Sequence, residues 1–350
     1  MSQHQKIIKD EAAKRKQREA KILTIAIVIV VIIFCFAAYF LSQHVAIKRA
    51  EQAALVLSLE LKAKEVLRQQ QRAEAEMLFT ESQLAARSAY VYDVNTKRAL
   101  FRKNAVDKLG IASVTKTMTA LAAYETIGKE ALVQINWTHL LTEGESSLIS
   151  GEYFRMKDLV DFMMVSSSND SATAIAQETG AYLLRERGDT GLTPEQTFVA
   201  EMNALAVKLG MEQTSFNNPT GLDENFETTL GAVSSARDIA LLFQYILETY
   251  PGLLEASHEP SLRITSEGGY VHNITNTNEI VTTLPNALAS KTGYTIQAGG
   301  NLAVIIDPGL NNPIIIVVLG STKEGRFTDV KTLSDATLAY LAKMASFDSQ

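Results

Sequence analysis

The first eighty residues combine one uninterrupted apolar stretch with a long, mostly polar segment. Residues 22–41 contain no charged residue, glycine or proline. Twenty helical residues span about 30 Å, the thickness of a bilayer core. The pattern therefore predicts a transmembrane helix over residues 22–41. A cleaved secretory signal, which would need an apolar stretch of only about 7–15 residues, is the main alternative. A buried core helix would rarely be apolar on all sides.

The segment that follows has the composition of an exposed helix. Residues 43–80 lack glycine and proline and are rich in Ala, Glu, Gln, Lys, Arg and Leu, which are strong helix formers. We therefore expect a helical stalk over residues 42–80. A seven-residue apolar seam contains Leu55, Leu59 and Val66 but is interrupted by Gln52, Lys62 and Gln69. The stalk is thus expected to be a spacer with, at most, weak self-association.

The remaining pattern alternates between strands and helices. Strands are predicted over residues 88–93 and 99–102, with a turn at 95–97, and over 301–306 and 313–319, with a Pro-Gly turn at 308–309. Helices are predicted over residues 113–127, 156–165, 170–178, 194–209, 234–247 and 331–344. Ser234 or Ser235 is the expected cap of the helix over 234–247, and Gly210 follows the helix over 194–209. This order of strands, many helices, strands and a helix predicts an α+β domain with an antiparallel sheet.

Charge indicates how the chain is oriented and excludes one class of partner. Seven basic residues and three acidic residues lie in residues 1–21, whereas the rest of the chain has 26 basic and 36 acidic residues. The positive-inside rule therefore places the N-terminus in the cytoplasm and the bulk of the chain outside. The net charge of −6 argues against nucleic-acid binding. Cys35 is the single cysteine, so an intrachain disulfide is excluded.

A serine and a lysine three residues apart suggest nucleophilic chemistry. Ser113 and Lys116 lie at the start of a predicted helix, where this spacing puts both side chains on one face. A serine hydroxyl needs a nearby base, and a lysine amine can serve if burial or a second cation lowers its pKa. Taken alone, the motif is better explained by an N-cap serine and a solvated lysine.

Two further motifs follow in order along the chain. Ser167, Ser168 and Asn169 form an S-x-N motif between two predicted helices, and residues 291–293 read Lys-Thr-Gly. Serine and asparagine between helices are also ordinary turn residues. A second S-x-N match, at residues 215–217, is set aside because it precedes a Pro-Thr-Gly turn. The order S-x-x-K, S-x-N and K-T-G is the motif set of penicillin-binding proteins and serine β-lactamases.

The chain resembles the low-molecular-mass D-alanyl-D-alanine carboxypeptidases of the peptidase S11 type. The resemblance rests on residues 111–120 around the S-x-x-K motif, residues 217–222, Asn276-Thr277-Asn278, and residues 290–295, Ser-Lys-Thr-Gly-Tyr-Thr. It covers roughly residues 85–345. It implies a catalytic domain over residues 81–350 with a β-lactamase/transpeptidase-like fold. In that fold a five-stranded sheet is flanked by helices, a helical subdomain is inserted, and the active site lies between them.

The resemblance also implies a role for each motif residue. Ser113 would be the acyl nucleophile, Lys116 the general base, Ser167 a proton relay, and Asn169 the residue that orients Lys116 and the substrate. Lys291, Thr292 and Thr295 would bind substrate, and Gly293 would let the backbone of the substrate approach the strand. The backbone N–H of Tyr294 would complete an oxyanion hole with the backbone N–H of Ser113. No cofactor is implied. A metal site is not expected, because the five histidines are scattered and no H-E-x-x-H motif occurs.

The implied activity is removal of the terminal D-Ala from peptidoglycan stem peptides, with β-lactams as inhibitors. The implied location is the bacterial cytoplasmic membrane, with the catalytic domain on its outer (periplasmic or extracellular) face. Relatives often carry a further C-terminal β-domain and an amphipathic anchor, and we expect neither after the last predicted helix.

Three alternatives to this activity stay open. The first is an endopeptidase that cuts D-Ala crosslinks. The second is a β-lactamase, for which Glu195 and Glu201 lack a recognisable deacylation-loop signature. The third is a non-catalytic membrane-tethered sensor of cell wall or β-lactam, although 21 cytoplasmic residues are few for signalling.

Overall fold

The computed structural model describes residues 3–80, 84–144, 147–188, 191–224, 229–309 and 311–348. The chain divides into two compact units, Met1–Arg72 and Ala73–Gln350. The first unit is part of one helix, α1 (Gln3–Thr80). The last turns of α1, from Ala73 onward, belong to the second unit, so this unit begins eight residues before the expected start at residue 81.

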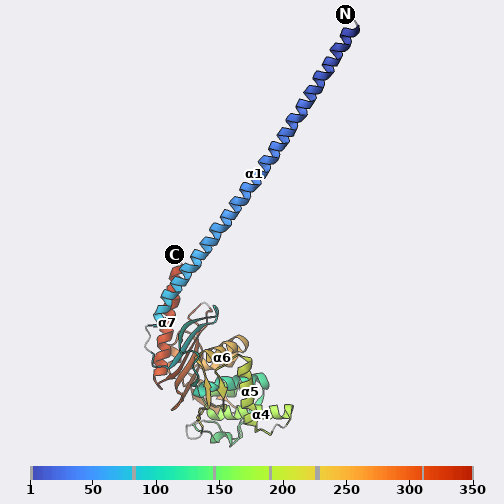
Figure 1. Cartoon of the computed structure of the whole chain (residues 1–350). Coiled ribbons are helices and arrows are strands. Elements are labelled where there is room, and N and C mark those ends of the chain that lie inside the picture. Colours follow the sequence, from blue (N-terminus) through green and yellow to red (C-terminus); the bar gives the residue numbers. More distant parts are fainter. Residues whose placement is uncertain are drawn as a thin grey trace. The chain divides into compact units, whose positions relative to one another are not determined.

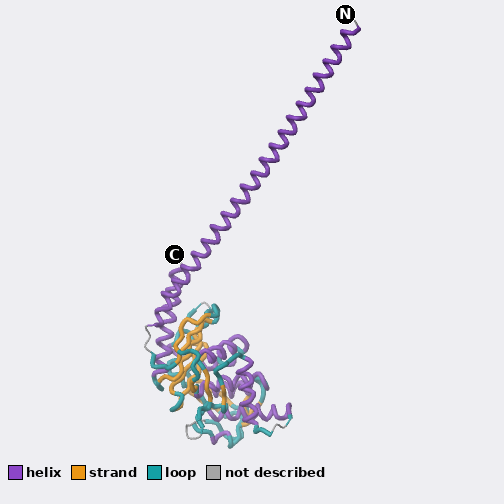
Figure 2. Tube along the Cα trace, in the orientation of Figure 1, coloured by secondary structure: helices purple, strands orange, loops and turns teal. Residues whose placement is uncertain are grey.

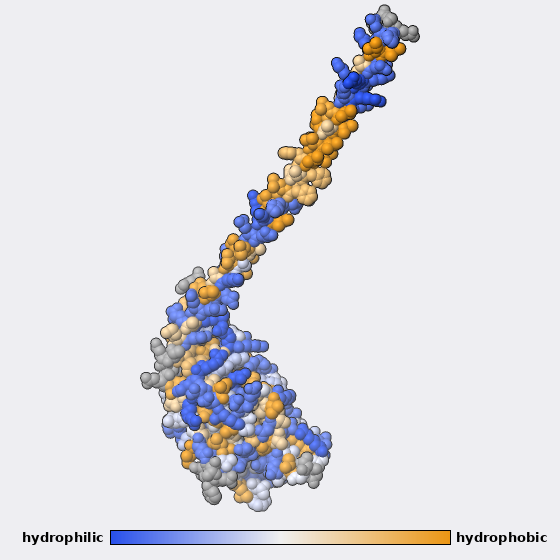
Figure 3. All heavy atoms as spheres, viewed as in Figure 1, coloured by the Kyte–Doolittle hydropathy of each residue, from blue (hydrophilic) through white to orange (hydrophobic). Residues whose placement is uncertain are grey.

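Helix α1 is continuous through the predicted membrane segment and the predicted stalk, so the helical prediction for residues 42–80 is confirmed. Its most apolar window has a mean hydropathy of 3.0 and no part of it is buried. Figure 3 shows this window as an apolar band on α1 between two polar stretches. By length and composition, α1 is the one helix of the described residues that could cross a membrane, a test that a signal sequence would also pass.

The second unit contains a five-stranded antiparallel sheet in the order β10-β11-β12-β1-β2. The strands are β1 (Ser88–Asp93), β2 (Arg98–Lys103), β10 (Ala287–Thr295), β11 (Gly299–Ile306) and β12 (Ile314–Ser321). Strand β1 pairs with β12, so the two ends of the domain meet in the middle of the sheet. The five-stranded sheet implied by the resemblance is therefore confirmed.

Helices cover both faces of this sheet. Alternate residues of β11 and β12 belong to two separate hydrophobic clusters, because neighbouring side chains of a strand point to opposite faces. One cluster packs against α6 (Ala236–Thr249). The other packs against α7 (Gly325–Asp348) and includes Phe79 at the end of α1. Figures 1 and 2 show α7 lying along the strands.

The last turn of α1 is part of this second cluster. The Phe79 side chain is fully buried, stacks on Phe101 of β2 at 5.7 Å between ring centroids, and lies 6.0 Å from the ring of Tyr340 in α7. An ion pair of 2.8 Å joins Lys343 to Glu74. The final turns of α1 are thus part of the folded domain.

The helical subdomain lies between β2 and β10 in the sequence. Its helices are α2 (Lys116–Thr126), α3 (Met156–Ser166), α4 (Asn169–Arg187) and α5 (Pro194–Lys208). Short strands accompany them: β3 (Leu109–Gly110), β4 (Leu132–Gln134), β5 (Tyr153–Arg155), β6 (Ser215–Phe216), β7 (Ala232–Ser234), β8 (Ser261–Thr265) and β9 (Val271–Thr275). The 3₁₀ turns are η1 (Ala112–Thr115), η2 (His139–Leu141), η3 (Pro251–Leu253), η4 (Glu255–His258) and η5 (Val281–Thr283).

Most predicted elements are confirmed, with differences at their ends. Helix α4 continues past the expected residue 178, and at Gly180 it packs directly against the start of α5, where a Cβ would lie 1.8 Å from the Pro194 carbonyl oxygen. Helix α7 starts at Gly325, six residues before the expected position, although glycine is a weak helix former. The hydroxyl of Ser235, not that of Ser234, caps α6 by accepting from Asp238 N.

Candidate active site

The three sequence motifs meet where η1, the α3–α4 turn and β10 converge. Ser113 lies in η1, and Lys116 is the first residue of α2. The nucleophile candidate is therefore in a 3₁₀ turn that leads into the helix, rather than at an N-cap. The Lys116 amine donates to Ser113 Oγ at 2.9 Å, so the one-face arrangement expected from the spacing is present.

The Lys116 amine is buried and lies within hydrogen-bond distance of three oxygen atoms. Besides Ser113 Oγ, it donates to Asn169 Oδ1 at 2.7 Å and to the Thr220 carbonyl at 2.8 Å. These acceptors are neutral, and burial lowers the pKa of Lys116 to about 7. The burial and the contacts with Ser113 and Asn169 agree with the sequence-based expectation. The amine is thereby available in its neutral form near neutral pH.

The S-x-N motif forms the turn between α3 and α4. Ser167 has a φ of 62°, a left-handed conformation that ends α3 and brings its hydroxyl towards β10. Ser168 caps α4 by accepting from Ser171 N. Asn169 points its oxygen at Lys116 while its Nδ2 donates to the Glu143 carbonyl. Both sides of the Asn169 amide are therefore used, which fixes its orientation.

The K-T-G motif supplies a second buried amine from β10. Lys291 Nζ donates to Ser167 Oγ at 2.8 Å and to the Thr292 carbonyl at 2.9 Å. Burial lowers the pKa of Lys291 well below its usual value, and the charges of Lys116 and Arg326 lower it further. The Thr292 hydroxyl lies 2.6 Å from that of Thr277.

Gly293 brings β10 against the turn that carries Ser113. A Cβ at Gly293 would lie 2.5 Å from the Ile111 carbonyl oxygen and 3.0 Å from Ser113 N. These are backbone atoms, which cannot move aside as a flexible side chain could. The family resemblance implies that Gly293 lets the substrate backbone approach the strand. The structure adds a reason within the protein itself.

The last two residues of the 290–295 segment contribute differently. The Tyr294 side chain is 42% exposed, and Lys323 Nζ lies 5.5 Å from its ring centroid. Thr295 Oγ1 accepts from Ala298 N at 3.1 Å and so stabilises the turn into β11. Any direct contact of Thr295 with substrate would have to coexist with this bond.

Sequence reasoning assigned no role to two contacts at the site. Arg326 of α7 is buried and donates to the Gly293 carbonyl at 2.9 Å; no motif marks it. The second contact is made by the backbone carbonyl of Thr220, so the type of side chain at this position does not indicate it. Only the resemblance of residues 217–222 to the family pointed to this loop.

The residues set aside or weighed as alternatives lie elsewhere in the structure. Asn217 donates through Nδ2 to the Leu230 carbonyl, and Ser215 belongs to β6. Glu201 pairs with Arg187 at 2.7 Å. Glu195 is hydrogen-bonded to Gln177 at 3.4 Å, and burial raises its pKa.

Three buried basic side chains of the site share one property. The hydrogen bonds of Lys116, Lys291 and Arg326 all go to neutral oxygens. Positive charge that no carboxylate balances in a buried site favours an anionic group, such as a carboxylate. The arrangement therefore brings together a serine hydroxyl, a buried lysine amine with a lowered pKa and a region suited to an anion.

Several known proteins are similar to this chain in sequence or fold. The family model described as D-alanyl-D-alanine carboxypeptidase, peptidase S11, matches residues 71–323. The D-alanyl-D-alanine carboxypeptidase DacF of Bacillus subtilis is 30% identical over 258 residues, which are 71% of this chain and 61% of that protein. A D-alanyl-D-alanine endopeptidase of Pseudomonas aeruginosa is 29% identical over 263 residues, 73% of this chain and 76% of that protein.

Among solved structures, penicillin-binding protein D2 of Listeria monocytogenes in its ampicillin-bound form has a similar fold. The TM-score is 0.58 at 27% identity, over 74% of this chain and 99% of that one. The fold is therefore that of the penicillin-binding DD-peptidases, as the resemblance implied. The match to residues 71–323 includes all three motifs, and the chain belongs to the peptidase S11 family of D-alanyl-D-alanine carboxypeptidases.

Proposed function

We propose that this chain is a membrane-anchored serine D-Ala-D-Ala carboxypeptidase that trims peptidoglycan stem peptides and is acylated by β-lactams. The observation that carries the proposal is the buried Lys116 amine, with a pKa lowered to about 7, at 2.9 Å from Ser113 Oγ. A base with a pKa near the working pH suits proton abstraction from a serine. Family membership supplies the substrate class.

In the proposed reaction, neutral Lys116 takes the proton of Ser113 as Oγ attacks the penultimate D-Ala carbonyl. The negative charge on the carbonyl oxygen would be stabilised by the backbone N–H groups of Ser113 and Tyr294. The C–N bond then breaks, and the leaving D-Ala amine receives a proton through Ser167. Water hydrolyses the acyl-enzyme and restores the serine. A β-lactam would form the same ester bond.

The terminal carboxylate of the peptide would bind beside Lys291 and Thr292. Lys291 donates to neutral oxygens, and its amine is adjacent to the Ser167 hydroxyl. A bound carboxylate would supply the negative charge that this buried cation lacks. Arg326, which supports Gly293 from behind, adds to the positive field.

Cleavage of D-Ala crosslinks is the second candidate. The carboxypeptidase of Bacillus subtilis is matched over 61% of its length, whereas the endopeptidase of Pseudomonas aeruginosa is matched over 76%. Both reactions cleave the amide bond after the penultimate D-Ala and use the same acyl-enzyme. They differ in whether the leaving group is free D-Ala or a crosslinked D-amino acid.

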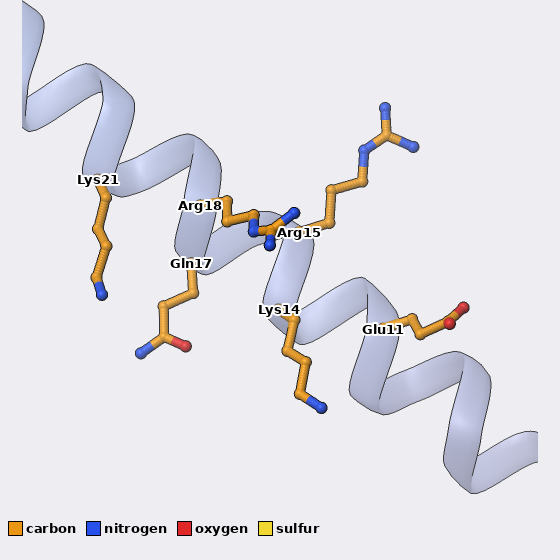
Figure 4. Close-up of a pocket in the computed structure, with 6 residues that line it drawn as sticks. All are labelled: Glu11, Lys14, Arg15, Gln17, Arg18 and Lys21. Atoms are coloured by element: carbon orange, nitrogen blue, oxygen red, sulfur yellow. The ribbon is translucent and has the colours of Figure 1, made fainter.

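For the membrane arrangement, we propose a cytoplasmic tail over residues 1–21, a spanning helix over 22–41, a stalk over 42–80 and the catalytic domain over 81–350. Figure 4 shows Lys14, Arg15, Arg18 and Lys21 projecting from the turns of α1 just before the apolar stretch. Clustered cations at this position favour a cytoplasmic N-terminus and an outward-facing catalytic domain.

The first test measures the activity directly. The full-length protein in detergent is expected to form a stable adduct with a labelled penicillin and to release D-Ala from a peptide ending in D-Ala-D-Ala. Ser113→Ala should abolish both, because no other hydroxyl is bonded to Lys116. Ser261→Ala, an exposed serine on β8, is the matched control.

The outcomes of this test separate the alternatives. Fast loss of the label with hydrolysed penicillin would indicate a β-lactamase. A stable adduct with cleavage of crosslinked dimers, but no release of D-Ala from the linear peptide, would indicate the endopeptidase. An adduct without any peptide cleavage would indicate a sensor. Absence of labelling would contradict the proposal altogether.

The second prediction concerns pH. Only neutral Lys116 can accept the proton, and burial has lowered its pKa from 10.5 to about 7. The acylation rate should therefore rise as the pH increases through about 7 and then level off. Since the neutral fraction changes about tenfold per pH unit below the pKa, acylation at pH 6 should be roughly tenfold slower than at pH 8. Stopped-flow labelling checks this. A midpoint near 10 would contradict the role of Lys116.

The third prediction concerns the close contact of β10. Gly293→Ala would place a Cβ 2.5 Å from the Ile111 carbonyl oxygen and so push β10 away from the Ser113 turn. We expect acylation to slow by at least about tenfold, equivalent to about 1.4 kcal/mol of activation free energy. Gly252→Ala is the control, since its Cβ would meet nothing closer than 3.9 Å. Equal rates for the two variants would show that the contact is not needed.

The fourth prediction tests orientation. In spheroplasts of a bacterium expressing the chain, externally added protease should degrade the catalytic domain and leave an N-terminal tag intact. The reason is that the cationic tail, residues 1–21, would remain inside. Lysed spheroplasts, in which both regions are accessible, provide the control. Protection of the catalytic domain before lysis would reverse the proposed topology.

A further inference from the structure

The loop that begins after β6 supplies one of the three acceptors of the Lys116 amine. Its Thr220 carbonyl accepts from Lys116 Nζ at 2.8 Å. A carbonyl in a loop can hold an ammonium or amine in place only if the loop itself is fixed. The residues that fix this loop therefore bear on the position of Lys116.

Asn218 is the centre of the hydrogen bonds within this loop. Its Oδ1 accepts from Thr220 N at 3.2 Å, from Thr220 Oγ1 at 2.9 Å and from Gly221 N at 2.8 Å. Its Nδ2 donates to the Leu222 carbonyl at 2.9 Å and to Glu224 Oε1 at 2.7 Å. The side chain is only 6% exposed, so these five bonds are made largely out of water.

The other side of the loop is held by α2 and η1. Thr119 Oγ1 donates to the Pro219 carbonyl at 2.7 Å. A Cβ at Gly221 would lie 2.0 Å from the Ala112 carbonyl oxygen and 2.6 Å from Thr115 Oγ1, so the loop backbone touches the turn that carries Ser113. A small displacement of the loop would therefore alter the surroundings of both Ser113 and Lys116.

We propose that Asn218 is a positioning residue of the active site, which holds the Thr220 carbonyl so that the Lys116 amine stays against Ser113 Oγ. The inference rests on the proposed function only in that Lys116 serves as the base. Asn218 touches neither reacting group, and it acts through the loop that it closes.

An ordinary Asx turn is the simpler explanation of an asparagine here, and it needs only the side-chain oxygen. The two bonds donated by Nδ2 distinguish Asn218 from such a turn. Asp in its place would keep an acceptor but lose both donors, and its carboxylate would face that of Glu224. The donors, rather than the turn, are what the proposal requires.

The experiment compares Asn218→Asp with a change of the same kind one residue away. Asn217→Asp removes a single bond, from Nδ2 to the Leu230 carbonyl, at an exposed residue. The measurements on the full-length protein in detergent are the rate of acylation by labelled penicillin, its pH midpoint and the fraction of protein labelled at completion.

For Asn218→Asp we expect acylation to slow about tenfold, comparable to the loss of one buried hydrogen bond. The pH midpoint should move upward from about 7, because burial is the cause of the low pKa of Lys116 and a loosened loop admits water. The other charged groups at the site, Lys291 of β10, Arg326 of α7 and Glu224 of the loop, are unchanged in this variant. The added carboxylate would also raise the pKa of Lys116, and Asn217→Asp adds the same charge one residue away as a control for this effect. Asn217→Asp should leave the midpoint in place.

A second variant tests the donor directly. In Asn218→Asp combined with Glu224→Gln, the new amide can donate to the new carboxylate, so the bond between positions 218 and 224 re-forms with its direction reversed. We expect this double variant to recover most of the lost rate. Glu224→Gln alone keeps an acceptor for Asn218 and should acylate normally. Should Asn218→Asp fail to fold, recovery of a labelled, folded double variant would still support the pairing.

Three results would overturn the inference: an Asn218→Asp protein with normal rate and midpoint, an equal shift in Asn217→Asp, or no recovery in the double variant. A lower labelled fraction with an unchanged rate and midpoint would also count against it, because that pattern reports misfolding alone. Failure of the unmodified protein to be labelled would instead contradict the proposed function.

Discussion

The burial of the Lys116 amine is the constraint on which the rest of the site depends. An amine removed from water favours its neutral form, and the acceptors around Lys116 are a hydroxyl, an amide oxygen and a carbonyl, none of which carries a charge to reverse that preference. The amine must nonetheless be held on all sides, since an unpaired buried donor costs free energy. Ser113, Asn169 and Thr220 lie on three different segments of the chain. Together they provide the hydrogen-bond partners of the buried Lys116 amine.

That convergence requires backbone to approach backbone more closely than side chains permit. Gly293 of β10 and Gly221 of the 217–224 loop both touch the η1 turn, and a Cβ on either would collide with main-chain oxygen atoms, of Ile111 and Ala112 respectively. The two contacts lie at consecutive residues of the turn before Ser113. Ser113 is therefore positioned by main chain on two sides, and its side chain faces Lys116.

The parts of this site that sequence could predict are those with reactive side chains in fixed spacing. Ser113 and Lys116 are separated by one helical turn, so their spacing predicted the contact between them. The place of Asn169 beside Lys116 was implied by the family resemblance that the order of motifs carries. Thr220 escaped assignment because its contribution is a carbonyl oxygen, which every residue has. Arg326 escaped because its partner, the Gly293 carbonyl, is distant in sequence and belongs to no motif. The secondary structure also divides into elements that the sequence predicts and elements that it does not. Strands β11 and β12 are long runs of apolar residues, and α3 and α6 are amphipathic, whereas β3 and β6, of two residues each, exist only through their pairing with β7.

The charges of the site complete the argument from burial. A protein interior tolerates a buried charge when an opposite charge accompanies it, as the 2.6 Å contact between Lys157 and the buried carboxylate of Asp161 illustrates elsewhere in this domain. Among the described residues no carboxylate pairs with Lys291, and the charge of Arg326, with that of Lys116 when it is protonated, lowers the pKa of Lys291 further. An incoming carboxylate would remove this deficit for Lys291. Lys116 is already hydrogen-bonded to three neutral oxygens, so the carboxylate would pair with Lys291 instead. Under the proposed function the two buried lysines would therefore differ in role although both are amines: Lys291 would bind the anion, and neutral Lys116 would accept the proton of Ser113 through its lone pair.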